Sequence, residues 1–103
     1  MQFYNNPQCD LDSDGFGASF GTWSADLAQL SNDTMVFVGA GAFSGAGSGY
    51  VPGDALEGRV AIARQGSVGN LGGVMLWDGS EGLLNVDGAG MDYLQYAKSA
   101  LEV

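Results

Sequence analysis

The stretch MVFVG (35–39) is a short, unbroken apolar run rich in valine. A run of this kind is typical of a strand that is buried on both faces, as in a parallel sheet. GGVMLW (72–77) is a second run of the same type, and the segment 2–5 (QFYN) also reads as extended. The sequence therefore predicts three strands, two of them buried on both faces.

Helical spacing of apolar residues follows each predicted strand. The expected apolar faces are Phe20, Trp23, Leu27 and Leu30, then Leu56, Val60 and Ala63 after Pro52, and finally Met91, Leu94, Ala97 and Leu101. The order βαβαβα predicts an α/β fold with parallel strands joined by right-handed crossovers. No linker or change of composition divides the chain, so residues 1–103 are expected to form one domain.

Composition excludes several classes of function. Twelve acidic residues against three basic ones give a net charge of −9, which repels both nucleic acid and anionic membranes. No apolar run reaches the roughly 18 residues of a transmembrane helix, and the first residues lack the pattern of a signal peptide. Without histidine, Ser-His-Asp and Cys-His catalysis and most zinc sites are excluded. No metal or cofactor is expected, and Cys9, the only cysteine, is interpreted as a small buried thiol.

Three motifs carry acids or glycines in patterns that resemble known sites. DLDSDG (10–15) resembles the start of a calcium loop, but its twelfth position is Gly21 instead of glutamate, which favours a solvated acidic turn. Gly39, Gly41 and Gly45 follow a predicted strand, but neither their spacing nor the following loop fits a dinucleotide site. Asp78 and Glu81, in LWDGSE (76–81), are either a catalytic carboxylate pair or solvated turn acids.

Tyr4, Trp77 and Asp78 lie at or just after the carboxyl ends of predicted strands. In an α/β barrel this rim carries the active site. Aromatic rings there would suit a sugar, because they offer flat apolar faces and, in tyrosine, a hydroxyl group. The alternative is that both rings fill the core.

Four stretches together resemble the C-terminal part of a family 18 glycoside hydrolase, of the class III chitinase branch of plants and fungi. They are QFYNNPQC (2–9), GTWSADLA (21–28), GAGSGYVPGDAL (45–56) and GGVMLWD (72–78). The resemblance implies that residues 1–103 correspond to the last three strand–helix units of a (β/α)8 TIM barrel, which would explain a chain that begins within a strand. It also implies an extracellular protein that hydrolyses chitin, a β-1,4-linked polymer of N-acetylglucosamine.

The same resemblance implies roles for individual residues. In that family the substrate's own acetamido oxygen attacks the anomeric carbon while a glutamic acid protonates the leaving oxygen. Tyr4 matches the catalytic tyrosine that holds the acetamido group, and Trp77 matches the floor under the reacting sugar. Gln2, Asn5 and Asp78 match substrate-binding positions, and the peptide bond between Trp77 and Asp78 is expected to be cis.

Departures from the family pattern limit this expectation. The D-x-x-D-x-D-x-E motif that carries the general acid is absent, and so is a cysteine upstream of Cys9 to pair with it. The chain alone is therefore expected to be inactive, with its site completed by a complementary barrel fragment. The alternative is a non-catalytic chito-oligosaccharide-binding or self-associating small α/β protein, since open strand edges favour self-association.

Overall fold

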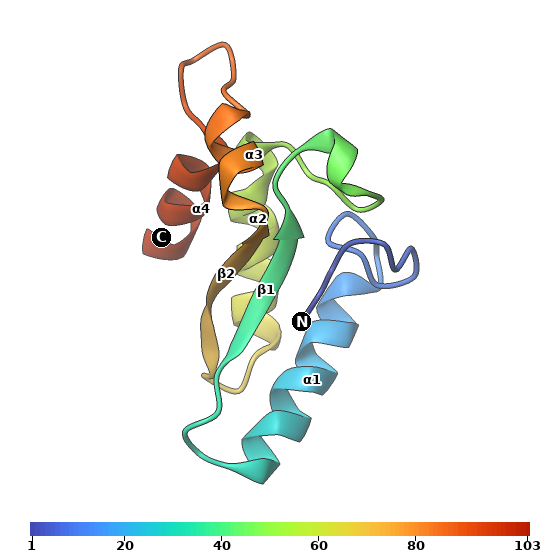
Figure 1. Cartoon of the computed structure of the whole chain (residues 1–103). Helices are drawn as coiled ribbons and strands as arrows, with labels where there is room; N and C mark the ends of the chain where they lie inside the picture. The colour runs from blue at the N-terminus through green and yellow to red at the C-terminus, as the bar shows by residue number, and fades with distance from the viewer.

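A computed structural model describes all residues 1–103, and it contains a parallel sheet packed against helices (Figure 1). In chain order the elements are α1 (Phe16–Leu30), β1 (Val36–Gly41), the 3₁₀ helix η1 (Ser44–Ala46), α2 (Gly53–Gly66), β2 (Leu71–Trp77), α3 (Gly79–Leu84) and α4 (Tyr93–Glu102). The predicted α/β class is confirmed. None of the helices is both long and apolar enough to cross a membrane.

Strands β1 and β2 pair in parallel, with Val38 opposite Val74 and Gly41 opposite Trp77. Helix α2 connects them, and the face predicted for it is confirmed, because Leu56, Val60 and Ala63 are all fully buried. A valine-rich run and an apolar helical stripe thus fold as the expected strand–helix–strand unit.

The prediction of a third strand over residues 2–5 is wrong. Only Gln2 forms a parallel bridge, to Gly39, with the Phe3 amide donating to the Gly39 carbonyl at 2.8 Å. The extended segment ends because Asn5 turns into the left-handed region with φ 59°. A side-chain carbon at Gly39 would overlap the Met1 carbonyl oxygen, so the close approach of these two backbones requires glycine.

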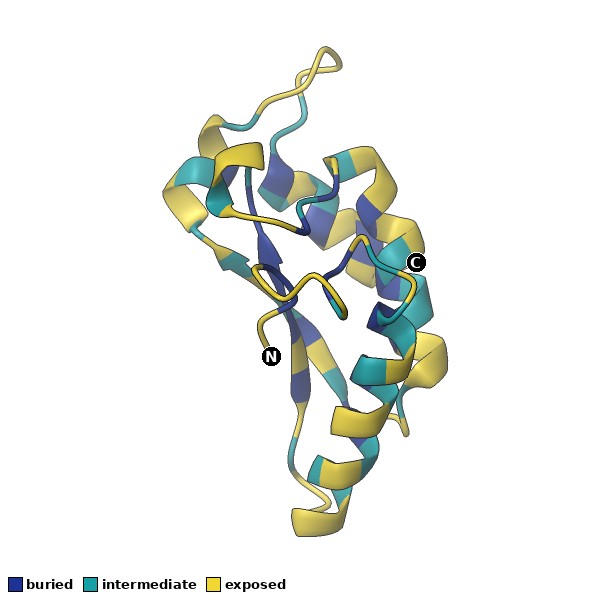
Figure 2. Ribbon diagram, turned by 90° about the vertical axis from the view of Figure 1, so that its right-hand side faces the viewer, coloured by how far each residue is buried: buried dark blue, intermediate teal, exposed yellow.

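The prediction that two strands are buried on both faces is also wrong. Helices α1 and α2 lie on one side of the sheet (Figure 2), where Val36, Val38 and Ala40 are buried. Side chains alternate along a strand, so the other face carries Phe37, Met75 and Trp77, which are 45%, 40% and 56% exposed. The sheet therefore presents an uncovered apolar face, defined by these three side chains.

Two predicted helical faces are rotated in the structure. Helix α1 begins one turn earlier than its predicted face, at Phe16, and buries Phe16, Phe20 and Ser24, while Trp23 is 41% and Leu30 79% exposed. Phe16 and Phe20 are turned toward Phe3, with ring centroids 4.9 and 5.9 Å from its ring. Packing against Phe3 therefore decides which face of α1 is buried.

Helix α4 starts after Asp92, whose carboxylate accepts from the Gln95 amide while the Gln95 side chain accepts from the Asp92 amide. This capping box fixes the start of the helix. Tyr93, Ala97 and Ala100 are consequently buried, whereas the predicted face was Met91, Leu94, Ala97 and Leu101. The short helix α3 was not predicted.

A buried polar cluster joins α1 to the start of β2. The Ser24 hydroxyl donates to Asn70 Oδ1 at 2.5 Å and accepts from the Val68 amide at 2.9 Å. We expect Ser24→Ala to lower the free energy of unfolding by about 1–3 kcal/mol, because both partners lose a hydrogen bond. Urea denaturation measures this change. Thr22→Ala, at an exposed position of the same helix, is the control, and an equal loss in both variants would contradict the account.

Candidate functional site

Parallel pairing brings the predicted site residues into one row at the carboxyl ends of the strands. Gln2 bridges Gly39, so Tyr4, two residues later, lies level with Gly41. A side-chain carbon at Gly41 would lie 4.0 Å from Tyr4 Cβ, and Gly41 is itself the register partner of Trp77. Gln2, Tyr4 and Trp77 therefore lie in one row on the same side of the sheet.

The two aromatic residues differ in accessibility. Trp77 is 56% exposed, whereas Tyr4 is only 8% exposed. The alternative that both rings fill the core therefore fails for Trp77, and Tyr4 is largely covered. An exposed indole at a strand end offers a flat apolar surface with a polar N–H, which suits a sugar ring.

The side chains of Gln2 and Asn5 are bound to the backbone. Gln2 Nε2 donates to the Tyr4 carbonyl at 2.9 Å, and Asn5 Oδ1 accepts from the Ser48 amide at 3.1 Å. The Asn5 amide also donates to the Ser48 carbonyl. Asn5 thus fixes the loop that contains η1, while its Nδ2 makes no intramolecular hydrogen bond.

Asp78 caps helix α3. Its Oδ1 accepts from the Glu81 amide at 3.0 Å and from the Ser80 hydroxyl at 2.8 Å. These two bonds, the one from Glu81 first, lower the pKa of the Asp78 carboxyl below its usual value. The expected cis peptide bond between Trp77 and Asp78 is present. Because Asp78 stays ionised at neutral pH, it is unsuited to donate a proton as a general acid.

The cap at Asp78 is expected to weaken in acid. A group whose pKa is lower in the folded state stabilises it above the unfolded pKa, and this contribution is lost as the pH falls through the folded pKa. We therefore expect hydrogen-exchange protection of the Glu81 amide to decrease in that range. Asp78→Asn keeps a capping oxygen without a titrating group, so its protection should stay constant; the same loss in this variant would contradict the assignment.

Asp10 does not belong to a solvated acidic turn, and that interpretation is wrong for this residue. It is 1% exposed, and its carboxylate accepts from the Asn6 amide at 2.7 Å and the Ser48 hydroxyl at 2.6 Å. Asp12 and Asp14 are exposed as expected. The carboxylate therefore ties the N-terminal loop to the loop after β1. No group of three or more His, Cys, Asp or Glu side chains is arranged to hold a metal, and Cys9 is a free, half-buried thiol.

The loop after β1 forms only the three-residue helix η1. A dinucleotide site needs a longer helix whose amino end faces the phosphates, so the glycines at 39, 41 and 45 serve another purpose. At Gly41 that purpose is the close approach of Tyr4 and Ala46 to the strand.

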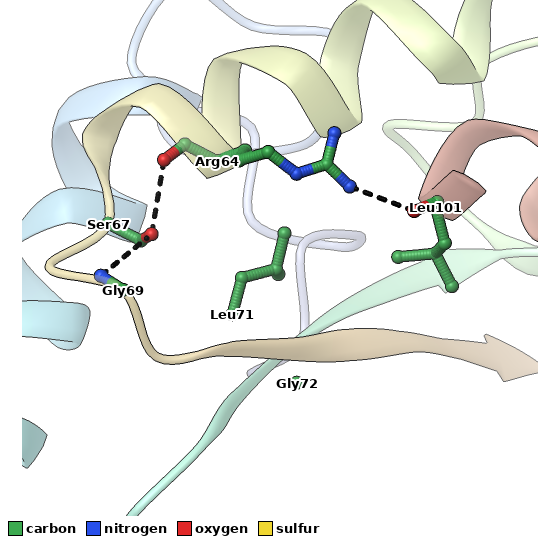
Figure 3. A pocket seen from close by; sticks show the side chains of 6 residues that line it. All are labelled: Arg64, Ser67, Gly69, Leu71, Gly72 and Leu101. Carbon is green, nitrogen blue, oxygen red and sulfur yellow. Dashed lines mark hydrogen bonds between the residues drawn. The ribbon is translucent and has the colours of Figure 1, made fainter. Parts of the chain in front are cut away.

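The largest hollow, about 540 Å3, lies beside the start of β2 and not at the candidate site. Figure 3 shows the Arg64 side chain extending toward Leu101, with Leu71 beneath it on β2. Arg64 donates to the Leu101 and Val103 carbonyls at 3.1 and 3.0 Å. A second hollow of about 330 Å3 is lined by residues 5–9. Neither includes Tyr4 or Trp77; Trp77 is exposed on the open face of the sheet, whereas Tyr4 is largely covered.

Most of this chain is similar to known proteins. No protein-family model matches the chain. Acidic endochitinase SE2 of Beta vulgaris is 40% identical over 80 residues, which are 75% of this chain and 25% of that protein. An acidic endochitinase of Phaseolus angularis is 38% identical over 78 residues, 76% of this chain and 26% of that protein. Endochitinase 3 of Metarhizium anisopliae is 30% identical over 86 residues, 82% of this chain and 28% of that protein. The chain thus spans about a quarter of the length of the curated relatives it matches, and over most of its own length it is similar to plant and fungal endochitinases.

Proposed function

We propose that this chain is a segment of a family 18, class III chitinase-like hydrolase and binds β-1,4-linked N-acetylglucosamine polymers. The similarity to endochitinases supports the substrate class. The observation that carries the proposal is Trp77, an indole 56% exposed at the end of β2, in the same row as Tyr4. In this proposal the segment forms the last three units of a (β/α)8 barrel of an extracellular protein.

Each residue of the row has a proposed role. Trp77 forms the floor under a sugar ring, and Tyr4 positions the acetamido group whose oxygen attacks the anomeric carbon. Gln2 contributes a polar contact beside them. Asn5 Nδ2 and Asp78 Oδ2 have no intramolecular hydrogen bond, so these atoms remain available for sugar hydroxyls.

In this proposal the residues of this chain bind and orient the substrate, and Asp78 does not protonate the leaving oxygen. A proton donor must be a neutral acid, and the two capping bonds to Asp78 favour its ionised form. The chain alone is therefore expected to bind chito-oligosaccharides without cleaving them, the general acid being supplied by further polypeptide.

The role of Tyr4 is tested with two ligands that differ only at the acetamido group. A cello-oligosaccharide has the same linkage but a hydroxyl in that place. We expect the chain to bind the chito-oligosaccharide more tightly, and Tyr4→Phe to reduce that preference about 2- to 10-fold, the effect of one neutral hydrogen bond. Titration calorimetry gives the affinities, and mass spectrometry is expected to show no shorter oligomers. If Tyr4→Phe kept the full preference for the chito-oligosaccharide, the role assigned to Tyr4 would be contradicted. Shorter oligomers in the mass spectra would contradict binding without cleavage.

Self-association is a second candidate, and the uncovered apolar face favours it. Phe37, Met75 and Trp77 are exposed together. The sheet has only two strands, and because the N-terminal segment covers part of the edge of β1, it is β2 that retains a free edge for pairing. Sedimentation velocity at several concentrations tests this, with Met75→Lys expected to restore the monomer. A chito-oligosaccharide would compete if both use Trp77. A monomer at every concentration would rule this candidate out.

A further inference from the structure

A third hollow, of about 190 Å3, lies between the start of α2, the loop after α3 and helix α4. It includes neither Tyr4 nor Trp77. Its lining includes Tyr50, Tyr93, Tyr96, Asn85, Asp54 and Asp87, and we call it the tyrosine pocket. The volume corresponds to about six water molecules at roughly 30 Å3 each, so only a small group fits.

Three aromatic rings enclose the tyrosine pocket. Tyr93 is buried and fixed by a hydrogen bond from its hydroxyl to the Val51 carbonyl at 2.9 Å. Tyr50 packs against it with ring centroids 5.7 Å apart. Tyr96 lies on Gly53, where a side-chain carbon would overlap its ring. Aromatic faces attract cations, and more strongly where water is excluded.

Two carboxylates stand at the exposed side of the pocket. Asp87 Oδ2 accepts a hydrogen bond from the Tyr96 hydroxyl, and its Oδ1 accepts from the Ala89 and Met91 amides. Asp54, in the first turn of α2, is exposed, and its carboxylate accepts no intramolecular hydrogen bond. The bond to Asp87 raises the pKa of Tyr96, and the charges of Asp87 and Asp54 act in the same direction. Both carboxylates line the pocket, so their negative charges lie at its wall.

No cation of this chain neutralises those charges. Arg59 and Arg64 bind backbone carbonyls elsewhere, and Lys98 pairs with Glu102 at 3.9 Å. The amino end of α2 contributes about half a positive charge, which two carboxylates outweigh.

Asn85 supplies an additional acceptor. Its Nδ2 donates to the Ala42 carbonyl and to the Tyr50 hydroxyl, both at 2.9 Å. Because a carbonyl can only accept, this bond fixes the orientation of the amide. Asn85 Oδ1 is left without a hydrogen bond, as a neutral acceptor in a half-buried side chain.

We propose that the tyrosine pocket binds a primary ammonium group, carried by a short alkyl amine or by an amino sugar. Such a group presents three N–H donors to the carboxylates and to Asn85 Oδ1, and its charge meets the tyrosine faces. The volume excludes large cations. The site is independent of the sugar-binding face and does not rest on the proposed function.

The test uses two pairs of probes, in each of which one member carries an ammonium group and the other a neutral group in its place. Two-dimensional NMR of the whole chain is recorded with n-butylammonium and with n-butanol, then with glucosamine and with N-acetylglucosamine. We expect millimolar binding of n-butylammonium, with shifts centred on Tyr50, Asn85 and Tyr96, and at least ten-fold weaker binding of n-butanol. If glucosamine shifts these resonances and N-acetylglucosamine does not, the ligands of the pocket include amino sugars. If n-butylammonium is the only probe that shifts them, the ligands are limited to alkyl amines.

Matched variants separate the pocket from general charge attraction. Asp54→Asn removes a carboxylate without intramolecular hydrogen bonds, and Asp26→Asn removes an exposed one on α1. We expect Asp54→Asn to weaken n-butylammonium binding about three-fold and Asp26→Asn to leave it unchanged. Equal binding of n-butanol, equal effects of the two variants, or no shift at these residues would overturn the proposal.

Discussion

Replacing Phe3 by alanine is expected to lower the free energy of unfolding by about 3–5 kcal/mol, the usual cost of removing a buried phenylalanine. Phe3 is fully buried, and its ring meets Phe16 edge-to-face at 4.9 Å and Phe20 at 5.9 Å. The loss is a large part of the roughly 5–15 kcal/mol that stabilises a domain of this size. Guanidinium denaturation, followed by far-UV circular dichroism, measures it.

Phe37→Ala is the matched control, because Phe37 is 45% exposed on the uncovered apolar face. It removes the same ring but opens no cavity in the core, so we expect a loss of about 1 kcal/mol or less. If the two variants were equally destabilised, the N-terminal segment would not be part of the core as described.

Replacing Arg59 by methionine is expected to cost about 2–4 kcal/mol, because hydrogen bonds to charged groups contribute roughly 1.5–3 kcal/mol each and are not fully additive. Arg59 reaches from α2 to the N-terminal loop, donating to the Leu11 carbonyl at 2.5 Å and to the Ser13 carbonyl at 2.7 Å. Its guanidinium carbon also lies 5.4 Å from the Phe16 ring centroid. Methionine keeps the apolar stem but leaves both carbonyls without this partner. Urea denaturation measures the change.

Arg64→Met provides the control for charge. Arg64 also donates to two carbonyls, those of Leu101 and Val103, but at exposed positions near the end of α4. Surface substitutions of this kind usually stay within about 0.5 kcal/mol. A loss as large as that of Arg59→Met would mean that net charge, and not the link to the N-terminal loop, controls stability.

Local patterns in the sequence predicted the central strand–helix–strand unit. The valine-rich run at 35–39 and the stripe of Leu56, Val60 and Ala63 lie where they were expected, because such elements depend mainly on neighbours in the chain. The start of α4 was also visible in principle, since Asp92 and Gln95 match a capping box.

Long-range contacts account for what the sequence did not predict. The buried face of α1 includes Ser24 because Asn70, 46 residues away, pairs with it. Whether a strand is covered on both faces depends on what packs against it, and a valine-rich pattern does not contain that information. Phe37 is exposed because no helix of this chain packs on its face of the sheet.

At the candidate site, the positions were predicted better than the contacts. Strand ends indicated Tyr4, Trp77 and Asp78, and the parallel register places Tyr4 and Trp77 in one row with Gly41 between them. The capping role of Asp78 and the buried position of Asp10 were missed. The capping role follows from a local D-x-x-E pattern, Asp78 to Glu81, whereas the burial of Asp10 depends on Ser48, 38 residues away.

The central claim is that Trp77 binds the sugar, and titration calorimetry with a soluble chito-oligosaccharide tests it most directly. Trp23 is the matched control, because it is the other tryptophan and is also exposed, on α1. We expect the unmodified chain and Trp23→Ala to bind equally, and Trp77→Ala to bind about ten-fold more weakly, since it loses both the stacking and the apolar area of the ring. Equal affinities of Trp77→Ala and the unmodified chain, or no binding by any of the three, would contradict the account.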